Sequence, residues 1–252
     1  MNNWTREETI VAFNVYCKIP FNNSSKTHPM IIEYAKILGR SPSALNMKVG
    51  NIGRLDPDLK KRGITGLVHG AKMEKEIWDE FYGNPEYLAY ESEKIIARLS
   101  NKSIEDSIAI KTDDLPQGAE RETIIKQRVN QSFFRSAVMS AYDFRCCISG
   151  VNIPQLVEAC HIVDWSKDAI NRTNPKNGLC MNAFFHKAYD KHLLAITPDM
   201  SIIISDELLQ PSIEESFVSY LKKINGRKIL TPNKFMPQRE FLEIHYNAFR
   251  CR

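Results

Sequence analysis

Four polar residues in the second half of the chain have the types and spacings that hydrolytic chemistry needs: His161, Asn177, His186 and Asp190. His186 and Asp190 are four residues apart in a predicted helix, so their side chains lie on one face with Cβ atoms about 6 Å apart. An imidazole and a carboxylate at that distance can share one divalent cation and leave positions open for water and a phosphate. The same spacing is typical of an ordinary surface contact, so the pair alone does not identify a metal site.

Two longer strings contain these residues, EACHIVDW around His161 and NPKNGLCMNAFFHKAYDKHLLAI, which holds the other three. Together they resemble the HNH nuclease family, in particular the branch that reads A-H-I, then N-G-L, then L-H-x-x-x-D. The resemblance covers residues 118 to 248 and implies a ββα-metal fold. It implies that His161 is the general base that takes a proton from the attacking water, and that Asn177 braces the loop presenting this base. It also makes His186 and Asp190 the metal-binding positions.

The chain departs from the family pattern at Cys160, where many members have an Asp or His as a third metal ligand. A Cys160 thiolate would suit a soft metal, but Mg²⁺ prefers oxygen, so the favoured interpretation is that Cys160 packs as a small apolar residue. We expect one Mg²⁺ or Mn²⁺, or another divalent metal, in each active site. A structural zinc site is not expected, because the only close cysteine pair is the adjacent Cys146-Cys147. Asp164 and His192 replace a Pro and a Gly that related sequences often show.

The periodicity around these residues predicts the elements that must position them. A long helix is predicted from Glu120 to Tyr142, with one apolar stripe at every fourth residue. Arg128 and Arg135 lie on a second stripe of this helix. They are either DNA contacts or part of a solvated face. Residues 146–163 predict a β-hairpin turned near Gly150, and a loop, a helix with His186 and further strand follow. In the loop, the basic residues Lys167, Arg172 and Lys176 are candidate phosphate contacts.

The first hundred residues predict helices over 5–18, from 30 to 39, from Ser41 onward, and within 71–98. The stretch YAKILGRSPSALNMKVG resembles a helix-turn-helix, in which Ser43, Asn46 and Lys48 would face the major groove. Seven basic and two acidic residues between Lys36 and Arg62 support DNA contact. A plain helical hairpin is the alternative.

The whole chain has 252 residues and a formal net charge of +4, which only faintly favours an anionic partner. No run approaches about 18 apolar residues, and the start, MNNWTREE, lacks a basic patch followed by an apolar stretch, so we expect a cytoplasmic location and no membrane partner. We predict an α+β chain with a helical DNA-recognition domain over residues 1–100, a polar linker over 101–118 and an HNH nuclease domain over 119–252.

The predicted function is a metal-dependent endonuclease for double-stranded DNA, and the predicted role is a restriction endonuclease. Cutting both strands with one site per chain needs a homodimer or two sequential nicks. The alternatives are a modification-dependent or nicking HNH nuclease and, from another class, a DNA-binding regulator that does not cleave.

Overall fold

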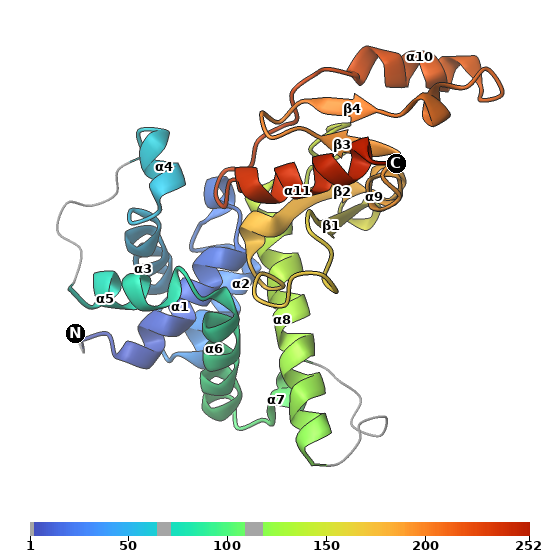
Figure 1. The fold of residues 1–252 in the computed structure, drawn as a ribbon. Coiled ribbons are helices and arrows are strands. Elements are labelled where there is room, and N and C mark those ends of the chain that lie inside the picture. The colour runs from blue at the N-terminus through green and yellow to red at the C-terminus, as the bar shows by residue number, and fades with distance from the viewer. Residues whose placement is uncertain (1–2, 65–71, 109–117) are drawn as a thin grey trace. The chain divides into compact units, whose positions relative to one another are not determined.

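The computed structural model describes residues 3–64, 72–108 and 118–252, and it has the mixed helix and sheet content that the sequence predicts (Figure 1). Its contacts define two compact units, Met1–Ala141 and Tyr142–Arg252. This division lies later in the chain than the predicted boundary. The long helix α8 (Ala119–Ala141) packs on the helices before it, against α1 (Arg6–Lys18) and α6 (Pro85–Leu99), and so belongs to the first unit.

The predicted linker is only partly visible in the structure. Residues 101–108 include the short helix α7 (Ile104–Ser107), which packs against α6. Residues 109–117 lie outside the described part of the chain. The described residues of the predicted linker therefore belong to the first unit, which extends to Ala141.

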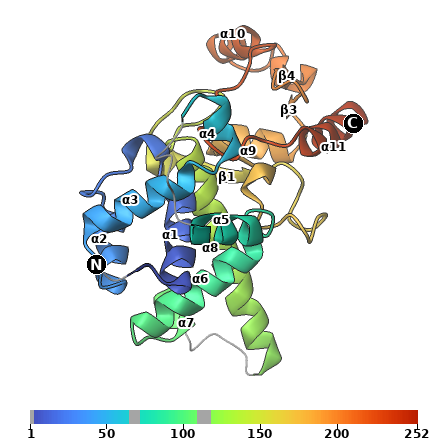
Figure 2. The ribbon, with the colours of Figure 1, turned by 90° about the vertical axis from the view of Figure 1, so that its left-hand side faces the viewer.

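The first unit is a helical bundle around α1. Residues Thr9 to Cys17 of this helix are buried on every side, and α1 contacts α3, α5, α6 and α8 (Figures 1 and 2). Its start is fixed by the predicted Thr5 cap, whose hydroxyl accepts from Glu8 N while the Glu8 carboxylate accepts from Thr5 N. The described part of this unit also contains α2 (Pro29–Ile37), α3 (Pro42–Gly53), α4 (Pro57–Lys61), α5 (Lys72–Phe81) and a 3-10 turn η1 (Phe21–Asn23).

The predicted helix-turn-helix segment forms α2, a turn at Gly39 and α3. Gly39 has φ 61°, a left-handed conformation that glycine adopts without a Cβ clash. The Ser41 side chain accepts from Ala44 N and Pro42 occupies the first helical position, so α3 begins where the sequence predicts. The two helices pack against each other and both contact α1.

The second unit contains two small antiparallel sheets. Strand β1 (Val157–His161) pairs with β2 (Gly178–Asn182), with Val157 opposite Asn182 and His161 opposite Gly178. The predicted hairpin within residues 146–163 is therefore wrong, because the partner of β1 lies beyond the 162–177 loop. The segment before β1 adds one bond to the sheet, from Cys147 N to Cys180 O at 2.7 Å.

Helix α9 (Ala183–Asp190) follows β2 directly and packs on β1, β2 and β3 (Leu194–Ile196). It begins at Asn182, whose side chain accepts from Phe185 N, and it ends in a turn where His192 has φ 51°. A left-handed residue directly after a helix is a position where glycine is common. The rest of the unit comprises β4 (Ile202–Ile204), paired with β3, the helices α10 (Glu215–Ile224) and α11 (Arg239–Arg250), and the 3-10 turns η3 (Pro154–Leu156), η4 (Pro175–Asn177) and η5 (Asp206–Leu209).

The helices in the described ranges are each too short or too polar to cross a membrane.

Candidate active site

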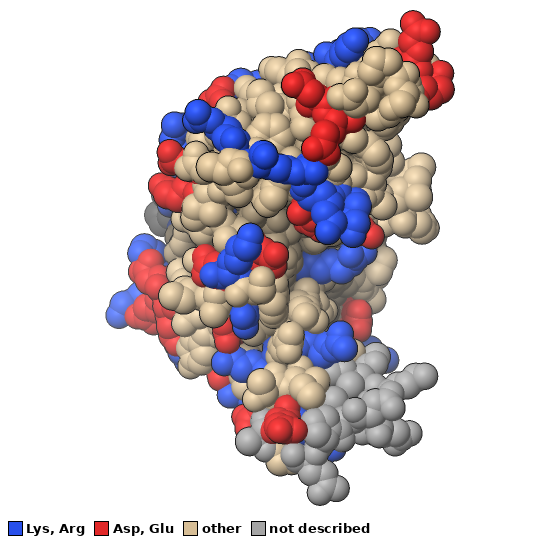
Figure 3. All heavy atoms as spheres, turned by 45° about the vertical axis from the view of Figure 1, so that its right-hand side comes forward, with Lys and Arg blue, Asp and Glu red and all other residues tan. Residues whose placement is uncertain are grey.

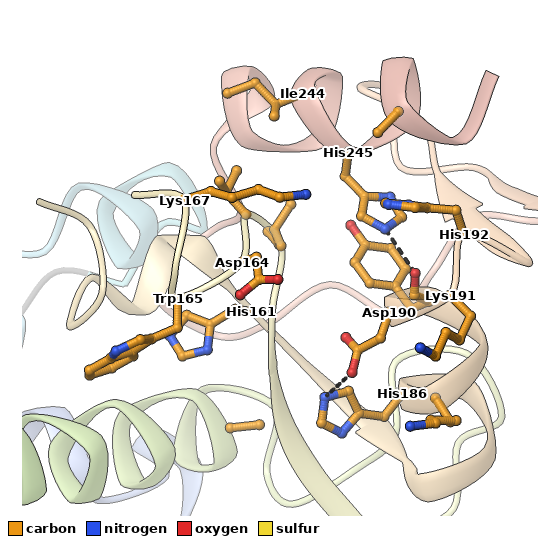
Figure 4. Close-up of a pocket in the computed structure, with 16 residues that line it drawn as sticks. His161, Asp164, Trp165, Lys167, His186, Asp190, Lys191, His192, Ile244 and His245 are labelled. Carbon is orange, nitrogen blue, oxygen red and sulfur yellow. Dashed lines mark hydrogen bonds and ion pairs between the residues drawn. The ribbon is translucent and has the colours of Figure 1, made fainter. Parts of the chain in front are cut away.

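The end of β1 and one face of α9 bring His161, His186 and Asp190 to a single cavity of about 420 Å³ (Figure 4). Cys160 and His161 are neighbours on β1, and side chains of neighbouring strand residues point to opposite faces. His186 and Asp190 lie one turn apart on α9. His161 and Trp165 stand on one side of the cavity, and His186 and Asp190 stand on the other (Figure 4).

The metal side consists of Cys160, His186 and Asp190. Their ligand atoms all lie within 4.8 Å of one another, and they are the one such group of three among the residues that the structure describes. The carboxylate of Asp190 lies between its partners, with Oδ2 at 3.5 Å from His186 Nε2 and Oδ1 at 4.0 Å from Cys160 Sγ. A thiol, an imidazole and a carboxylate at these separations are a donor set that fits one divalent cation.

Burial differs across this group. Cys160 is fully buried, whereas the side chains of His186 and Asp190 are 25% and 50% exposed. Burial, together with the nearby carboxylates of Asp190 and Glu158, raises the pKa of the Cys160 thiol. The group is therefore closed on the strand side and open toward the cavity, as a catalytic metal site needs to be for water and substrate to enter.

Glu158 is a residue of the site that the sequence did not reveal. Its Oε2 lies 2.6 Å from His186 Nδ1, and a carboxylate there accepts the Nδ1 proton. The neutral imidazole then carries its lone pair on Nε2, the nitrogen that faces Asp190. A carboxylate that holds a histidine in this way fixes the tautomer that ligates a metal. The available signal was the spacing of Glu158 and Cys160, which places both on the same face of one strand.

The base side is built from the loop that follows β1. His161 is half-buried, and its Nε2 lies 2.9 Å from the carbonyl oxygen of Arg172. Because a carbonyl only accepts, Nε2 carries the hydrogen, and Nδ1 of the neutral ring is the basic nitrogen. Burial lowers the pKa of His161 below its ordinary value of 6.5, against the opposing effects of the Arg172 carbonyl and the Asp164 carboxylate.

Trp165 and Arg172 hold the two ends of this loop together. The edge of the Trp165 ring meets His161 at a centroid distance of 5.6 Å. The guanidinium of Arg172 lies 5.3 Å from the Trp165 ring centre, and its Nε donates to the Trp165 carbonyl at 2.7 Å. The Arg172 side chain, predicted as a phosphate contact, is therefore engaged within the loop, and its backbone carbonyl orients the base.

Asn177 is fully buried beneath the same loop. Its Oδ1 accepts from Val163 N at 2.8 Å, and its Nδ2 donates to the Val163 carbonyl at 3.0 Å. Its own carbonyl accepts from Ile162 N at 2.9 Å. These bonds tie the two residues that follow His161 to the start of β2, which is the bracing position that the resemblance implies.

Three lysines line the cavity: Lys167, Lys187 and Lys191. All three are exposed, and only Lys167 was singled out from the sequence. Lys187 lies on α9 and Lys191 directly follows it, so the segment that carries His186 and Asp190 also brings positive charge to the rim. Lys176, another predicted phosphate contact, is half-buried on η4 and does not line the cavity.

Helix α11 forms a wall of the cavity through Ile244, His245 and Ala248. His245 is buried and stacks on Tyr189 of α9, with ring centres 3.5 Å apart and an interplanar angle of 4°. Its Nε2 lies 3.0 Å from the Tyr189 carbonyl, and burial lowers its pKa to about 4. His245 is thus a neutral packing residue that anchors α11 beside the site.

The other predicted DNA contacts belong to the first unit. Ser43 is exposed on α3, Asn46 is half-buried and accepts a hydrogen bond from Ser24, and Arg128 and Arg135 are exposed on α8. The predicted apolar stripe of α8 is buried, as expected: Ile125, Val129, Phe133, Ala137 and Ala141.

The prediction that Lys48 faces outward to DNA is wrong. Lys48 is 5% exposed, and its ammonium donates to Glu74 at 2.8 Å in a buried ion pair with a 1% exposed carboxylate. Arg54 also pairs with Glu74, and Arg40 pairs with Glu8. Acids from outside the 36–62 stretch therefore neutralise part of its charge, and on the face drawn in Figure 3 basic and acidic side chains are interspersed.

Comparison with known proteins agrees with the geometry. A family model described as HNH endonuclease matches residues 146–197, a range that contains β1, the loop, β2, α9 and every residue of the base and metal sides. No curated protein matches the chain.

Proposed function

We propose that this chain is a metal-dependent endonuclease that hydrolyses phosphodiester bonds in duplex DNA, because the HNH endonuclease model matches its residues 146–197. The observation that carries the proposal is the shared cavity. In this cavity His161, whose pKa is lowered by burial, faces the candidate metal ligands His186 and Asp190. Three lysines also line the cavity.

In the proposed reaction, Nδ1 of His161 accepts a proton from a water molecule, whose oxygen attacks phosphorus. The Arg172 carbonyl, on the opposite ring nitrogen, stabilises the imidazolium that forms. The bond from phosphorus to the 3′-oxygen breaks and the leaving oxygen takes a proton from solvent, which gives a 5′-phosphate and a 3′-hydroxyl. Asn177 and the Trp165–Arg172 contact keep the base in place and take no part in proton transfer.

The proposed metal ligands are His186 and Asp190, with Glu158 holding the His186 ring. When bound, a divalent cation supplies positive charge for the scissile phosphate and for the leaving 3′-oxygen. Lys167, Lys187 and Lys191 contact the DNA backbone on either side of the scissile phosphate. The identity of the metal, for which the sequence predicts Mg²⁺ or Mn²⁺, depends on whether there is a third protein ligand.

The proposed biological role is that of a restriction endonuclease. The helical unit, with the exposed Ser43 on its α2–α3 segment and Arg128 and Arg135 on α8, would read the DNA. Double-strand cleavage would come from a homodimer or from sequential nicks. A modification-dependent or nicking enzyme is the second candidate, and comparison of cleavage on methylated and unmethylated plasmid separates the two.

The proposed function is tested with supercoiled plasmid and a divalent metal. We expect the wild-type chain to relax or linearise the plasmid, and His161→Ala to leave it supercoiled while still shifting DNA in a gel. Cleavage by His161→Ala equal to wild type would contradict the assignment of the base. A wild-type chain that binds DNA without cutting it under any metal would identify the non-cleaving regulator instead.

A further inference from the structure

The sequence favours Cys160 as a packing residue, but in the structure its sulfur lies near both the His161 carbonyl oxygen, at 3.4 Å, and the Asp190 carboxylate. Cys160 Sγ lies 4.0 Å from Asp190 Oδ1, and the second oxygen of the same carboxylate lies 3.5 Å from His186 Nε2. One carboxylate thus stands between a thiol and an imidazole, and all three donors belong to elements that pack directly on each other, β1 and α9.

We propose that Cys160 is the third protein ligand of the catalytic metal, bound as a thiolate, and that the site therefore selects a borderline cation such as Zn²⁺ over Mg²⁺. This inference rests on the proposed function, because it concerns the same metal site. On coordination, the thiol proton leaves to solvent and the sulfur lone pair forms the bond to the metal.

The observed separations agree with this assignment. Around a tetrahedral Zn²⁺, with bonds of about 2.3 Å to sulfur and about 2.0–2.1 Å to nitrogen and oxygen, ligand atoms stand about 3.3–3.6 Å apart. The carboxylate-to-imidazole distance of 3.5 Å already falls in this range. The carboxylate-to-sulfur distance of 4.0 Å lies just above this range, and all three ligand atoms lie within 4.8 Å of one another.

The ligand chemistry determines the selectivity. Mg²⁺ requires near-octahedral oxygen coordination and keeps several waters, and a thiolate is a poor ligand for it. Zn²⁺ and Co²⁺ accept sulfur, nitrogen and oxygen in one tetrahedral shell. Three protein ligands leave the fourth position for water or a phosphate oxygen, and the exposed sides of His186 and Asp190 open that position to the cavity.

The decisive measurement is the absorption spectrum of the chain loaded with Co²⁺, in a phosphine-reduced buffer free of small thiols. We expect a sulfur-to-cobalt charge-transfer band in the near ultraviolet and intense visible bands of four-coordinate Co²⁺. Cys160→Ser should lose the charge-transfer band. Cys180→Ser, which changes a buried cysteine of the paired strand outside the ligand group, should keep it.

Competition tests the selectivity in the same cuvette. One equivalent of Zn²⁺ should bleach the cobalt spectrum, whereas about a thousandfold excess of Mg²⁺ should leave it intact. Cys160→Asp, which supplies oxygen in place of sulfur, should bind Co²⁺ without the charge-transfer band and release it to Mg²⁺. This variant also distinguishes loss of a ligand from loss of folding.

Two results would overturn the inference: a wild-type cobalt spectrum without the charge-transfer band, or a band that persists in Cys160→Ser. The spectrum is independent of cleavage. A chain that shows the band but cuts no plasmid has thiolate ligation without the proposed nuclease function. A chain that cuts plasmid and lacks the band has the function without the thiolate ligand.

Discussion

The two sides of the cavity use histidine in opposite ways, although they begin at neighbouring residues of one strand. On the base side, His161 meets a backbone carbonyl and the edge of a tryptophan, and burial dominates its titration. On the metal side, His186 is held between the carboxylates of Glu158 and Asp190. The difference shows that the groups facing each ring determine its role: a carbonyl leaves a neutral base, and carboxylates prepare a ligand for a cation.

The two sides are also held by different parts of the structure. The base depends on a loop of residues 162–177 that is tied down by side-chain bonds from Asn177 and Arg172. The metal ligands depend on a strand and a helix whose backbone geometry is fixed by regular hydrogen bonds. Substitutions in the loop should therefore lower turnover and leave metal affinity unchanged. Substitutions on the metal side should lower metal affinity before they affect turnover at saturating metal.

Apart from a change of His161 itself, Asn177→Ala should cause the largest loss of cleavage rate among variants of the base side. This change leaves the Val163 N–H and carbonyl without their buried partner, which costs about 1–3 kcal/mol of stability. It also loosens the loop, and a misplacement of about 1 Å can cost about 10²-fold in rate. Single-turnover plasmid cleavage and urea unfolding measure the two effects. Unchanged turnover in a folded variant would show that the loop needs no brace.

Glu158→Gln should weaken metal binding without changing the base. The amide still reaches Nδ1 of His186 but no longer supplies a negative acceptor, so we expect metal affinity to fall about 10–100-fold. Calorimetric titration of the metal measures this. Turnover at saturating metal should stay near the wild-type value, and a loss of turnover that metal cannot restore would place Glu158 in the chemistry instead.

The pH dependence of the cleavage rate reports the protonation state of the proposed base, His161. His161 must be neutral to accept a proton, and its pKa lies below 6.5, so activity should rise with pH and level off at a lower pH than an ordinary histidine would give. Asp164→Asn removes a carboxylate that raises this pKa and should move the acid limb further down. Single-turnover rates across pH measure both, and an acid limb above 6.5 would contradict the environment assigned to His161.

The smallest effect is expected on DNA affinity, when a lysine at the rim of the cavity is removed. Lys191→Ala should weaken DNA binding several-fold and lower the slope of log affinity against log salt by about 1, because one phosphate contact is lost. Lys222→Ala, an exposed lysine on α10 that does not line the cavity, is the matched control. Equal salt slopes for the two variants would remove Lys191 from the proposed DNA path.

Residue types and helical spacing were enough to predict most helices and to single out His161, His186 and Asp190, which line one cavity. His186 and Asp190 lie on one face of α9, and the apolar stripe of α8 is buried, because both depend on a period that the sequence carries. The pairing of β1 with β2 was missed, since strands of five residues separated by a loop leave no periodic signal. Glu158 was also missed, because its contact with His186 forms only when β1 lies against α9.

Long-range charge pairing was the other source of error. Lys48 occupies a helix position that suits a DNA contact, and only the fold places Glu74 beside it, from a helix 26 residues further along the chain. The second unit begins after α8 for a similar reason, because that helix buries its apolar stripe against α1 and α6. Sequence identifies which residues need partners, and tertiary packing decides which partner each receives.

If the base and the metal ligands are separate parts of one site, removing the base should leave metal binding intact. Metal binding to His161→Ala, measured by calorimetry on the preparation that is used for plasmid cleavage, tests this separation. We predict one metal per chain, bound with wild-type affinity, together with no cleavage. Weakened metal binding in this variant, or cleavage at the wild-type rate, would contradict the division between the two sides.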